Sequence, residues 1–326
     1  MAKKEEKPKL KLAVYWGAAC GGCCVSVLDV HEALFDVVAV ADLVFWPIAL
    51  DFKYKDVEAM EDKFIDVTLF NGAVRNSENE HMAKLLRQKT KILVAYGSCS
   101  HMGGIPGLAN FTTKEALFER IYHTTESTEN PDKIVPVTEF KVAEGILELP
   151  EFYNDVRTLD QVVEVDYYLP GCPPQTERLV EVFMAIVTGA ELPPPGSVVG
   201  ALEKTLCDEC PREKTDNKKI KKFFRPIDIE DDGKTCFLEQ GVICMGPATR
   251  GGCGARCIEG NAPCRGCYGP SADCTDPGAK MMSAIGTMID SDDPDEILEI
   301  IDTIDDPAGT FYRFSLPGSL LRRKII

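Results

Sequence analysis

Basic charge is scarce in this sequence. Lysine and arginine number 36 against 52 aspartates and glutamates, which gives a net charge of −16. Such an acidic balance disfavours nucleic acid and anionic membrane surfaces as partners, so we expect neither. The same fixed negative charge makes it harder to add an electron to any redox centre that the chain holds, which lowers its potential.

Long apolar runs and histidine are scarce as well. No stretch approaches the roughly 20 apolar residues that a transmembrane helix needs, so we expect no membrane span. We also expect a cytoplasmic location, because the charged N-terminus precedes a strand-length apolar run with no cleavage site or twin arginine. The only histidines are His31, His81, His101 and His123, and only His101 lies beside a candidate ligand.

Cysteine, in contrast, is abundant, with fourteen in 326 residues. In a reducing compartment such a number indicates metal or redox sites rather than disulfides. The hydrophobic content of 44% is enough for a sizeable core in one large or two ordinary domains.

Four cysteines follow three runs of strand-forming residues, each at a turn of small residues. In open parallel sheets the carboxyl ends of the strands meet at one edge, where such folds keep their sites. Four thiols around one point suit a [4Fe-4S] cluster or a zinc ion. The alternative is that Cys99 and Cys172 are ordinary buried thiols. The runs are Leu12–Trp16 with Cys20 and Cys23, Lys91–Tyr96 with Cys99, and Val163–Leu169 with Cys172.

Strand-like and helix-like patterns alternate from about residue 9 to residue 190. We interpret them as a doubly wound, flavodoxin-like α/β domain with a parallel sheet. Residues 126–160 are expected to form loops and short strands around Ile134–Val137. Further strands are expected at Val37–Phe45 and Asp66–Gly72. A first helix is expected to carry Val27, Leu28, Leu34 and Phe35 on one face, and a second to begin with a capping box from Ser77 to Glu80 and to bury Met82, Leu85 and Leu86. A third helix is expected to begin with a capping box from Thr112 to Glu115, and a fourth to bury Leu179, Val182, Phe183 and Ile186 and to end at Gly189.

A domain boundary is predicted at Pro193–Gly196, because consecutive prolines cannot continue a helix. We therefore divide the chain into a flavodoxin-like domain of residues 1–192 and a C-terminal domain of residues 193–326. Nine of the fourteen cysteines fall between Cys207 and Cys274, among glycine, proline and charge with little hydrophobic periodicity. We expect this irregular segment to lack a core of its own and to be organised by bound metal clusters.

The C-terminal tail returns to helical patterning. Asp293 is placed to cap a helix with Pro294 in its first turn, and Ile297, Ile301 and Ile304 form one apolar stripe. The basic end Arg322–Ile326 is most simply a solvated tail, and docking on an acidic partner is the alternative.

The C-terminal cysteines can be divided by spacing into two sets of four. Cys253, Cys257, Cys264 and Cys267 form a compact run of the kind that iron-sulfur sites use. Zinc is the alternative at each site, although neither set shows the two C-x2-C pairs that structural zinc commonly uses. Cys207, Cys210, Cys236 and Cys244 make the other set, and Cys24 and Cys274 remain as small buried hydrophobes.

These residues resemble a known family, the small electron-transfer subunit of [NiFe] hydrogenases, over nearly the whole chain. The resemblance implies three [4Fe-4S] clusters: a proximal one on Cys20, Cys23, Cys99 and Cys172, a medial one on Cys253, Cys257, Cys264 and Cys267, and a distal one on Cys207, Cys210, Cys236 and Cys244. Cys207 replaces the histidine of many members, and Cys257 replaces a proline, which implies four irons in the medial cluster. The motifs are Trp16–Cys23, Gly97–Cys99, Pro170–Pro174, Phe237–Glu239, Cys244–Thr249, Cys253 and Ala262–Cys267.

The resemblance also implies a division of labour. The chain has no histidine shortly after a pair of C-x2-C motifs, so the nickel-iron centre that splits hydrogen is expected on a large-subunit partner. The chain would then be a hydrogenase subunit, with no catalytic residue of its own, that carries electrons from that centre to an acceptor. Without an export signal it is most similar to the viologen-reducing, heterodisulfide-reductase-associated hydrogenase of methanogens, which implies a small iron-sulfur delta subunit and heterodisulfide reductase as partners.

Three alternatives stay open at this point. The first is the gamma subunit of the deazaflavin-reducing hydrogenase. The second is a quinone-reductase-type small subunit, which shares the proximal motifs but is shorter. The third is a zinc-stabilised scaffold without a redox role.

Overall fold

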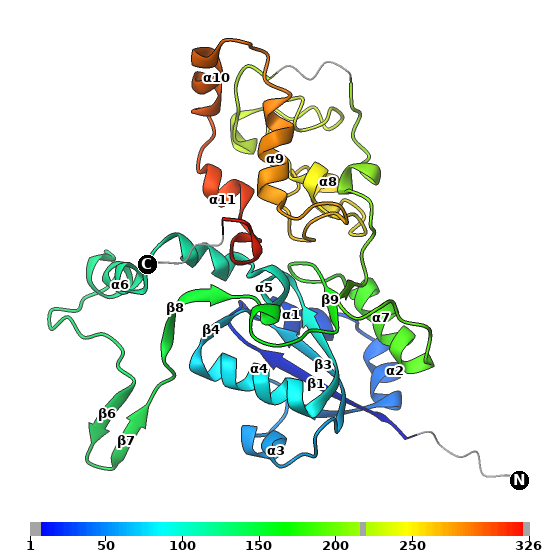
Figure 1. Ribbon diagram of the computed structural model, residues 1–326, viewed down its shortest axis with the longest axis vertical. Helices are drawn as coiled ribbons and strands as arrows, with labels where there is room; N and C mark the ends of the chain where they lie inside the picture. Colours follow the sequence, from blue (N-terminus) through cyan, green and yellow to red (C-terminus); the bar gives the residue numbers. More distant parts are fainter. Residues whose placement is uncertain (1–7, 216–219, 322–326) are drawn as a thin grey trace, which may run out of the picture.

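A six-stranded parallel sheet forms the centre of the N-terminal part of the chain (Figure 1). The computed structural model describes residues 8–215 and 220–321. The strand order is β10-β9-β5-β3-β1-β2, and every neighbouring pair is parallel, which confirms the predicted fold class. The strands are β1 (Leu10–Trp16), β2 (Ala41–Phe45), β3 (Ile65–Asn71), β5 (Thr90–Tyr96), β9 (Tyr167–Leu169) and β10 (Ser197–Val198).

Helices cover both faces of this sheet. Successive residues of a strand point to opposite faces, so Leu12 and Val14 of β1 pack in one core with Phe183, while Tyr15 packs in the other with Met82. The helices of this part are α1 (Gly22–Leu28), α2 (Ala33–Val40), α3 (Tyr54–Glu58), α4 (Ser77–Lys89), α5 (Ser98–Met102), α6 (Lys114–Phe118) and α7 (Thr176–Thr188).

The first helical region differs from the prediction. Helix α1 ends at Leu28, and His31 then takes a left-handed φ of 53°, so the chain turns before α2 begins. The turn breaks the expected common face: Val27 is buried, whereas Phe35 is 76% exposed. The expected strand Val37–Phe45 is also too long, because its first half is the end of α2 and only β2 joins the sheet.

Two helix starts lie one residue from the predicted caps. Asn76 caps α4 in place of Ser77, because its side chain accepts from the amide of Asn79. Thr113 caps α6 in place of Thr112. The inward residues of α4 and the end of α7 at Gly189, which is in the left-handed conformation, are as predicted.

Residues 126–160 contain strands, but not at Ile134–Val137. Strands β6 (Glu139–Val142) and β7 (Gly145–Glu148) form an antiparallel hairpin that extends away from the sheet in Figure 1. Strands β4 (Val74–Asn76) and β8 (Phe152–Arg157) form a second antiparallel pair. The expected strand Val163–Leu169 is confined to β9, where the backbone pairs with β5 and β10.

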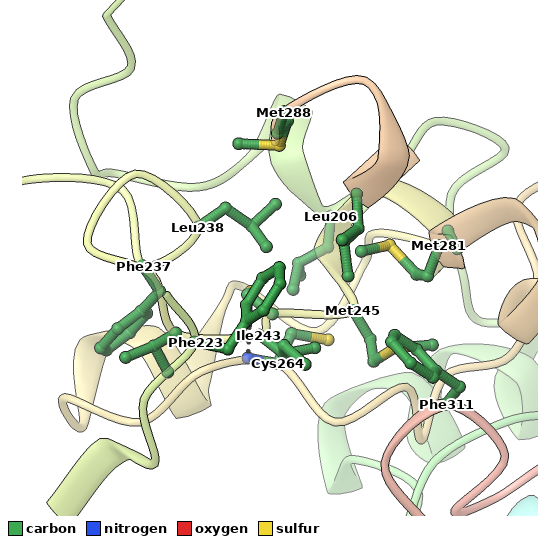
Figure 2. Close-up of a cluster of buried hydrophobic side chains, with 14 of the residues drawn as sticks. Leu206, Phe223, Phe237, Leu238, Ile243, Met245, Cys264, Met281, Met288 and Phe311 are labelled. Carbon is green, nitrogen blue, oxygen red and sulfur yellow. Dashed lines mark hydrogen bonds between the residues drawn. The ribbon is translucent and has the colours of Figure 1, made fainter. Parts of the chain in front are cut away.

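The cysteine-rich segment has a hydrophobic core, so the expectation that it lacks one is wrong. Figure 2 shows Leu206, Phe223, Phe237 and Leu238 gathered with buried side chains from later in the segment. Most of these residues lie in loops and single turns, so no helical or strand periodicity marks them in the sequence. The helices here are α8 (Arg256–Glu259), α9 (Pro277–Gly286), α10 (Pro294–Ile301) and α11 (Pro307–Phe311).

The tail is partly as predicted. Asp293 caps α10 by accepting from the amides of Asp295 and Glu296, but Ile300 rather than Ile301 is the buried residue. Arg322–Ile326 lies outside the described residues. None of the helices in residues 8–215 and 220–321 combines the length and the apolar character that crossing a bilayer requires.

Candidate metal centres

The four thiols at the strand ends come together at the carboxyl edge of the sheet. Cys20 lies just before α1 and Cys23 within it, Cys99 lies in α5 directly after β5, and Cys172 follows β9. Burial raises the pKa of Cys23, and the nearby charges of Cys99, Cys172 and Cys20 raise it further. The four thiols that follow the predicted strands therefore lie near one another.

Two glycines make room for these sulfurs. A Cβ on Gly97, whose φ is +88°, would lie 2.4 Å from the sulfur of Cys23. A Cβ on Gly104 would lie 2.5 Å from the sulfur of Cys99. Because no real Cβ approaches that closely, the backbone closes on the sulfurs only where these residues are glycine. The turns that carry the thiols are thus also the turns that need glycine.

Backbone amides act on two sulfurs of this first set, and two of its four thiols are buried. The amide of Gly22 donates to the sulfur of Cys20 over 3.4 Å. Burial raises the pKa of Cys99 to about 12, and the Ile105 amide opposes that shift. Cys23 and Cys99 are buried, whereas Cys20 and Cys172 are exposed, so the set lies at the protein surface.

A second set lines one cavity in the C-terminal segment. Cys207, Cys210, Cys236 and Cys244 belong to its wall, together with Phe237. Burial raises the pKa of Cys207 to about 12 and that of Cys244 to about 11. The four cysteines that their spacing groups together therefore share one cavity.

The third set lies between the first two. Burial raises the pKa of Cys267 to about 12, and the nearby charges of Cys172 in the first set and of Cys257 and Cys253 raise it further. The amide of Cys264 donates to the sulfur of Cys244 in the second set over 3.3 Å. The third set is therefore next to the first through Cys267 and next to the second through Cys264.

Sequence reasoning missed Glu209, which lies between two ligand candidates of the second set. Its carboxylate accepts from the amide of Gly252 over 3.0 Å and lies 3.7 Å from the sulfur of Cys253. It thus joins the loop of the second set to the first thiol of the third. No local signal could have shown this, because 44 residues separate the carboxylate from Cys253.

The other singled-out residues lie near these sets. Cys24 and Cys274 are buried, and Asn71 donates to the sulfur of Cys24 over 3.2 Å. The ring of His101 packs against Tyr168 with centroids 4.7 Å apart, and burial lowers the pKa of His101 to about 4. His101 therefore packs as a neutral ring against Tyr168.

The chemistry of the donors suits iron-sulfur clusters. Each set offers four thiols, and amides donate to the sulfurs of Cys20 and Cys244, as they do around cluster ligands. Within the described residues, no three side chains of His, Cys, Asp or Glu are grouped closely enough to hold a single metal ion.

The fold and the thiol sets define a class: an α/β redox protein with sulfur-lined sites at a sheet edge and in a cysteine-rich extension. Residues 20–186 match the family model described as NADH ubiquinone oxidoreductase, 20 Kd subunit. The iron-sulfur subunit of the F420-non-reducing hydrogenase of Archaeoglobus profundus is 41% identical over 97% of this chain and 99% of its own length. The corresponding subunit of the F420-non-reducing hydrogenase of Methanothermobacter thermautotrophicus is 39% identical over 97% of both chains.

A solved structure shows the same fold. A chain of the [NiFeSe]-hydrogenase of Dm. baculatum matches with a TM-score of 0.50 and 21% identity, over 82% of this chain and 96% of that chain. The chain described here belongs to the family of these F420-non-reducing hydrogenase subunits, within the wider family of the 20 Kd subunit. It is an oxidoreductase subunit, of the small electron-transfer kind that [NiFe] hydrogenases have.

Proposed function

We propose that this subunit carries electrons from hydrogen oxidation, at a nickel-iron centre on a large subunit, through three [4Fe-4S] clusters to a partner. Cys20, Cys23, Cys99 and Cys172 would hold the proximal cluster, and Cys253, Cys257, Cys264 and Cys267 the medial one. Cys207, Cys210, Cys236 and Cys244 would hold the distal one. Such clusters supply one-electron redox chemistry when bound.

One observation supports this proposal above the others, namely that the three thiol sets form an unbroken series. Cys267 lies close enough to Cys172 for that thiol to change its pKa, and the amide of Cys264 bonds to the sulfur of Cys244. Electron carriers must be near neighbours, whereas three independent structural zinc sites have no such requirement. The series begins at the exposed Cys20 and Cys172, on the surface of the sheet domain.

The protein itself binds the clusters, shields them and adjusts their surroundings. Glycines at 97 and 104 let the backbone close on the sulfurs, and the amides of Gly22 and Cys264 donate to thiolate sulfur. Such bonds stabilise added negative charge, so they favour the reduced state of a bound cluster. The net charge of −16 acts in the opposite direction.

The surface beside the first thiol set fits a large protein partner. Trp16, Val25 and Leu28 are 39%, 54% and 50% exposed, although they lie on or next to the elements that carry Cys20 and Cys23. Exposed apolar side chains grouped around a site mark protein interfaces. We propose that the hydrogenase large subunit packs here, which brings its hydrogen-splitting centre close to the proximal thiols.

The remaining partners are proposed from the relatives. The names of the relatives specify hydrogenases that do not reduce F420, a deazaflavin, which counts against the deazaflavin-reducing alternative. The match over 97% of this chain includes the C-terminal cysteines and counts against the shorter quinone-reductase type. We propose a small iron-sulfur delta subunit and heterodisulfide reductase as acceptors, and the cytoplasm as the location.

Iron and sulfide analysis tests the proposal. The chain is produced with its large subunit and purified without oxygen, and iron and acid-labile sulfide are measured per chain. About twelve of each are expected, because each cubane cluster contains four irons and four sulfides. A value near four would leave only the proximal cluster. Stoichiometric zinc, with no visible absorption and no paramagnetic signal after reduction, would establish the scaffold alternative instead.

A further inference from the structure

A cavity of about 290 Å³ lies in the C-terminal segment, and none of its lining residues is a cysteine. Phe223 and Ile243, both labelled in Figure 2, form part of its wall where the hydrophobic core ends. Two arginines, Arg265 and Arg313, form another part. This volume is close to the lower limit for sites that hold small organic ligands.

Neither of these two arginines is matched by an acidic side chain in the part of the chain that the structure describes. Within residues 8–215 and 220–321, neither guanidinium has a carboxylate at ion-pair distance, and the Nε of Arg313 is buried without a hydrogen-bond partner. A buried donor without a partner is costly, so the Nε of Arg313 is a candidate to bind an acceptor.

The acidic residues of the cavity are already engaged by groups other than these two arginines. Asp305 lies 3.5 Å from the Nε of Arg225, which also forms two hydrogen bonds with Asp228. Asp306 accepts from the amide of Gly309 and caps α11. Neither carboxylate therefore neutralises the arginine pair.

We propose that this cavity binds a small molecule with an oxyanion group, a phosphate or a carboxylate, held between Arg265 and Arg313. The guanidinium group presents its donors in a planar fork that matches both groups, and two arginines in one cavity suit a doubly charged oxyanion. The aromatic wall at Phe223 and Phe224 gives the rest of the molecule an apolar contact.

Cysteine thiolates are the alternative counter-charge, but they serve only one of the two arginines. Arg265 lies in the loop between Cys264 and Cys267, and the charges of Cys244 and Cys264 act on it. Arg313 lies beyond α11, outside every cysteine loop. A pure role in balancing cluster charge would therefore leave the buried Nε of Arg313 unexplained.

Calorimetric titration of the anaerobic holoprotein tests the site. Inorganic phosphate and malonate are titrated separately at constant ionic strength, with chloride as the reference anion. We expect saturable binding of at least one of them at one site per chain. The Arg313→Gln and Arg265→Lys variants should each bind about tenfold more weakly or worse, because each loses a bidentate contact.

Arg225→Gln is the matched control. It removes an arginine from the same cavity wall, but Asp228 already uses that guanidinium, so binding should stay within about twofold. Binding of phosphate alone would identify a phosphate ligand, and binding of malonate alone a carboxylate. No saturable binding, or equal binding by wild type and Arg313→Gln, would overturn the proposal. Iron content is measured on the same samples, so this outcome is distinct from failure of the cluster assignment.

Discussion

The hydroxyl of Ser98 lies 2.6 Å from the backbone carbonyl oxygen of Cys267, 169 residues further along the chain. The same hydroxyl lies 2.8 Å from the carbonyl oxygen of Gly171. One serine beside Cys99 therefore joins the loop before Cys172 to the backbone of Cys267 in the third set. Ser98 is only 1% exposed, so water does not compete for these contacts. A hydrogen bond between Ser98 and Cys267 thus connects the first thiol set with the third.

Removal of this hydroxyl should weaken that attachment. We expect Ser98→Ala to lower the free energy of unfolding by about 1–3 kcal/mol, because the carbonyl oxygen of Cys267 loses its donor, whereas that of Gly171 keeps the backbone amide of Ser98. Denaturant titration of the anaerobic protein measures the loss. Ser197→Ala is the control, since its exposed hydroxyl bonds only to the nearby carbonyl of Pro194 and its removal should cost less than about 0.5 kcal/mol. Equal losses in both variants would contradict the proposed attachment.

Space around the proximal thiols should limit substitution at Gly97. In Gly97→Ala the new Cβ would lie 2.4 Å from the sulfur of Cys23, so we expect this variant to lose about four irons per chain. Gly196→Ala is a closely matched control: Gly196 has the same φ of +88°, but no atom lies within 4 Å of the added Cβ. That variant should carry the backbone strain and keep its iron. Full iron in Gly97→Ala would show that Cys23 is not held as a ligand there.

The fourth thiol of the medial set is directly testable. We expect Cys257→Pro or Cys257→Ala to convert a four-iron into a three-iron cluster of higher potential, because Cys253, Cys264 and Cys267 remain. Paramagnetic resonance of the oxidised protein and the iron content, lower by about one per chain, give the readout. Cys274→Ser is the control and should leave both unchanged. An unaltered spectrum in both Cys257 variants would remove this residue from the ligands.

The pH dependence of stability should differ between metal-free and cluster-loaded protein. Burial raises the pKa of Cys99, Cys207 and Cys267 to about 12, above the value of 9.0 for a free thiol. In the metal-free fold these thiols are neutral, so their contribution is complete below pH 9 and is lost as pH rises toward 12. A bound cluster holds them as thiolates, so the loaded protein should lack this alkaline loss and lose clusters in acid. Denaturant midpoints across the pH range, for both forms, provide the measurement.

The parts of the fold that could be predicted are those with a local signal. Residues 92–96 lie in a parallel sheet that is covered on both faces, so they form a continuous apolar run in the sequence. The small residues after β1, β5 and β9 mark turns, and parallel strands bring those turns to one edge. The helix caps Asn76 and Thr113 lie one residue from the predicted caps, because the cap is the residue whose side-chain oxygen reaches a free backbone amide of the first turn.

The C-terminal segment has a core and long-range contacts that no local sequence pattern predicts. Its cysteine spacing separated two sets of four, but its core of Leu206, Phe223 and other loop residues has no period to detect. The contacts of Glu209 with Cys253 and of Ser98 with Cys267 join residues 44 and 169 positions apart. A pattern read along the chain contains no information about such pairs.

The amino-acid sequence by itself determined the inventory of this protein: fourteen thiols, their grouping by spacing, the acidic charge and the alternation that builds a parallel sheet. These follow from backbone geometry and side-chain chemistry within a few residues. Only the tertiary structure decided that Cys267 lies beside Cys172, and that Arg265 and Arg313 share one cavity. The physical reason is that close packing selects the partners of distant segments, and it depends on the shape of the whole fold.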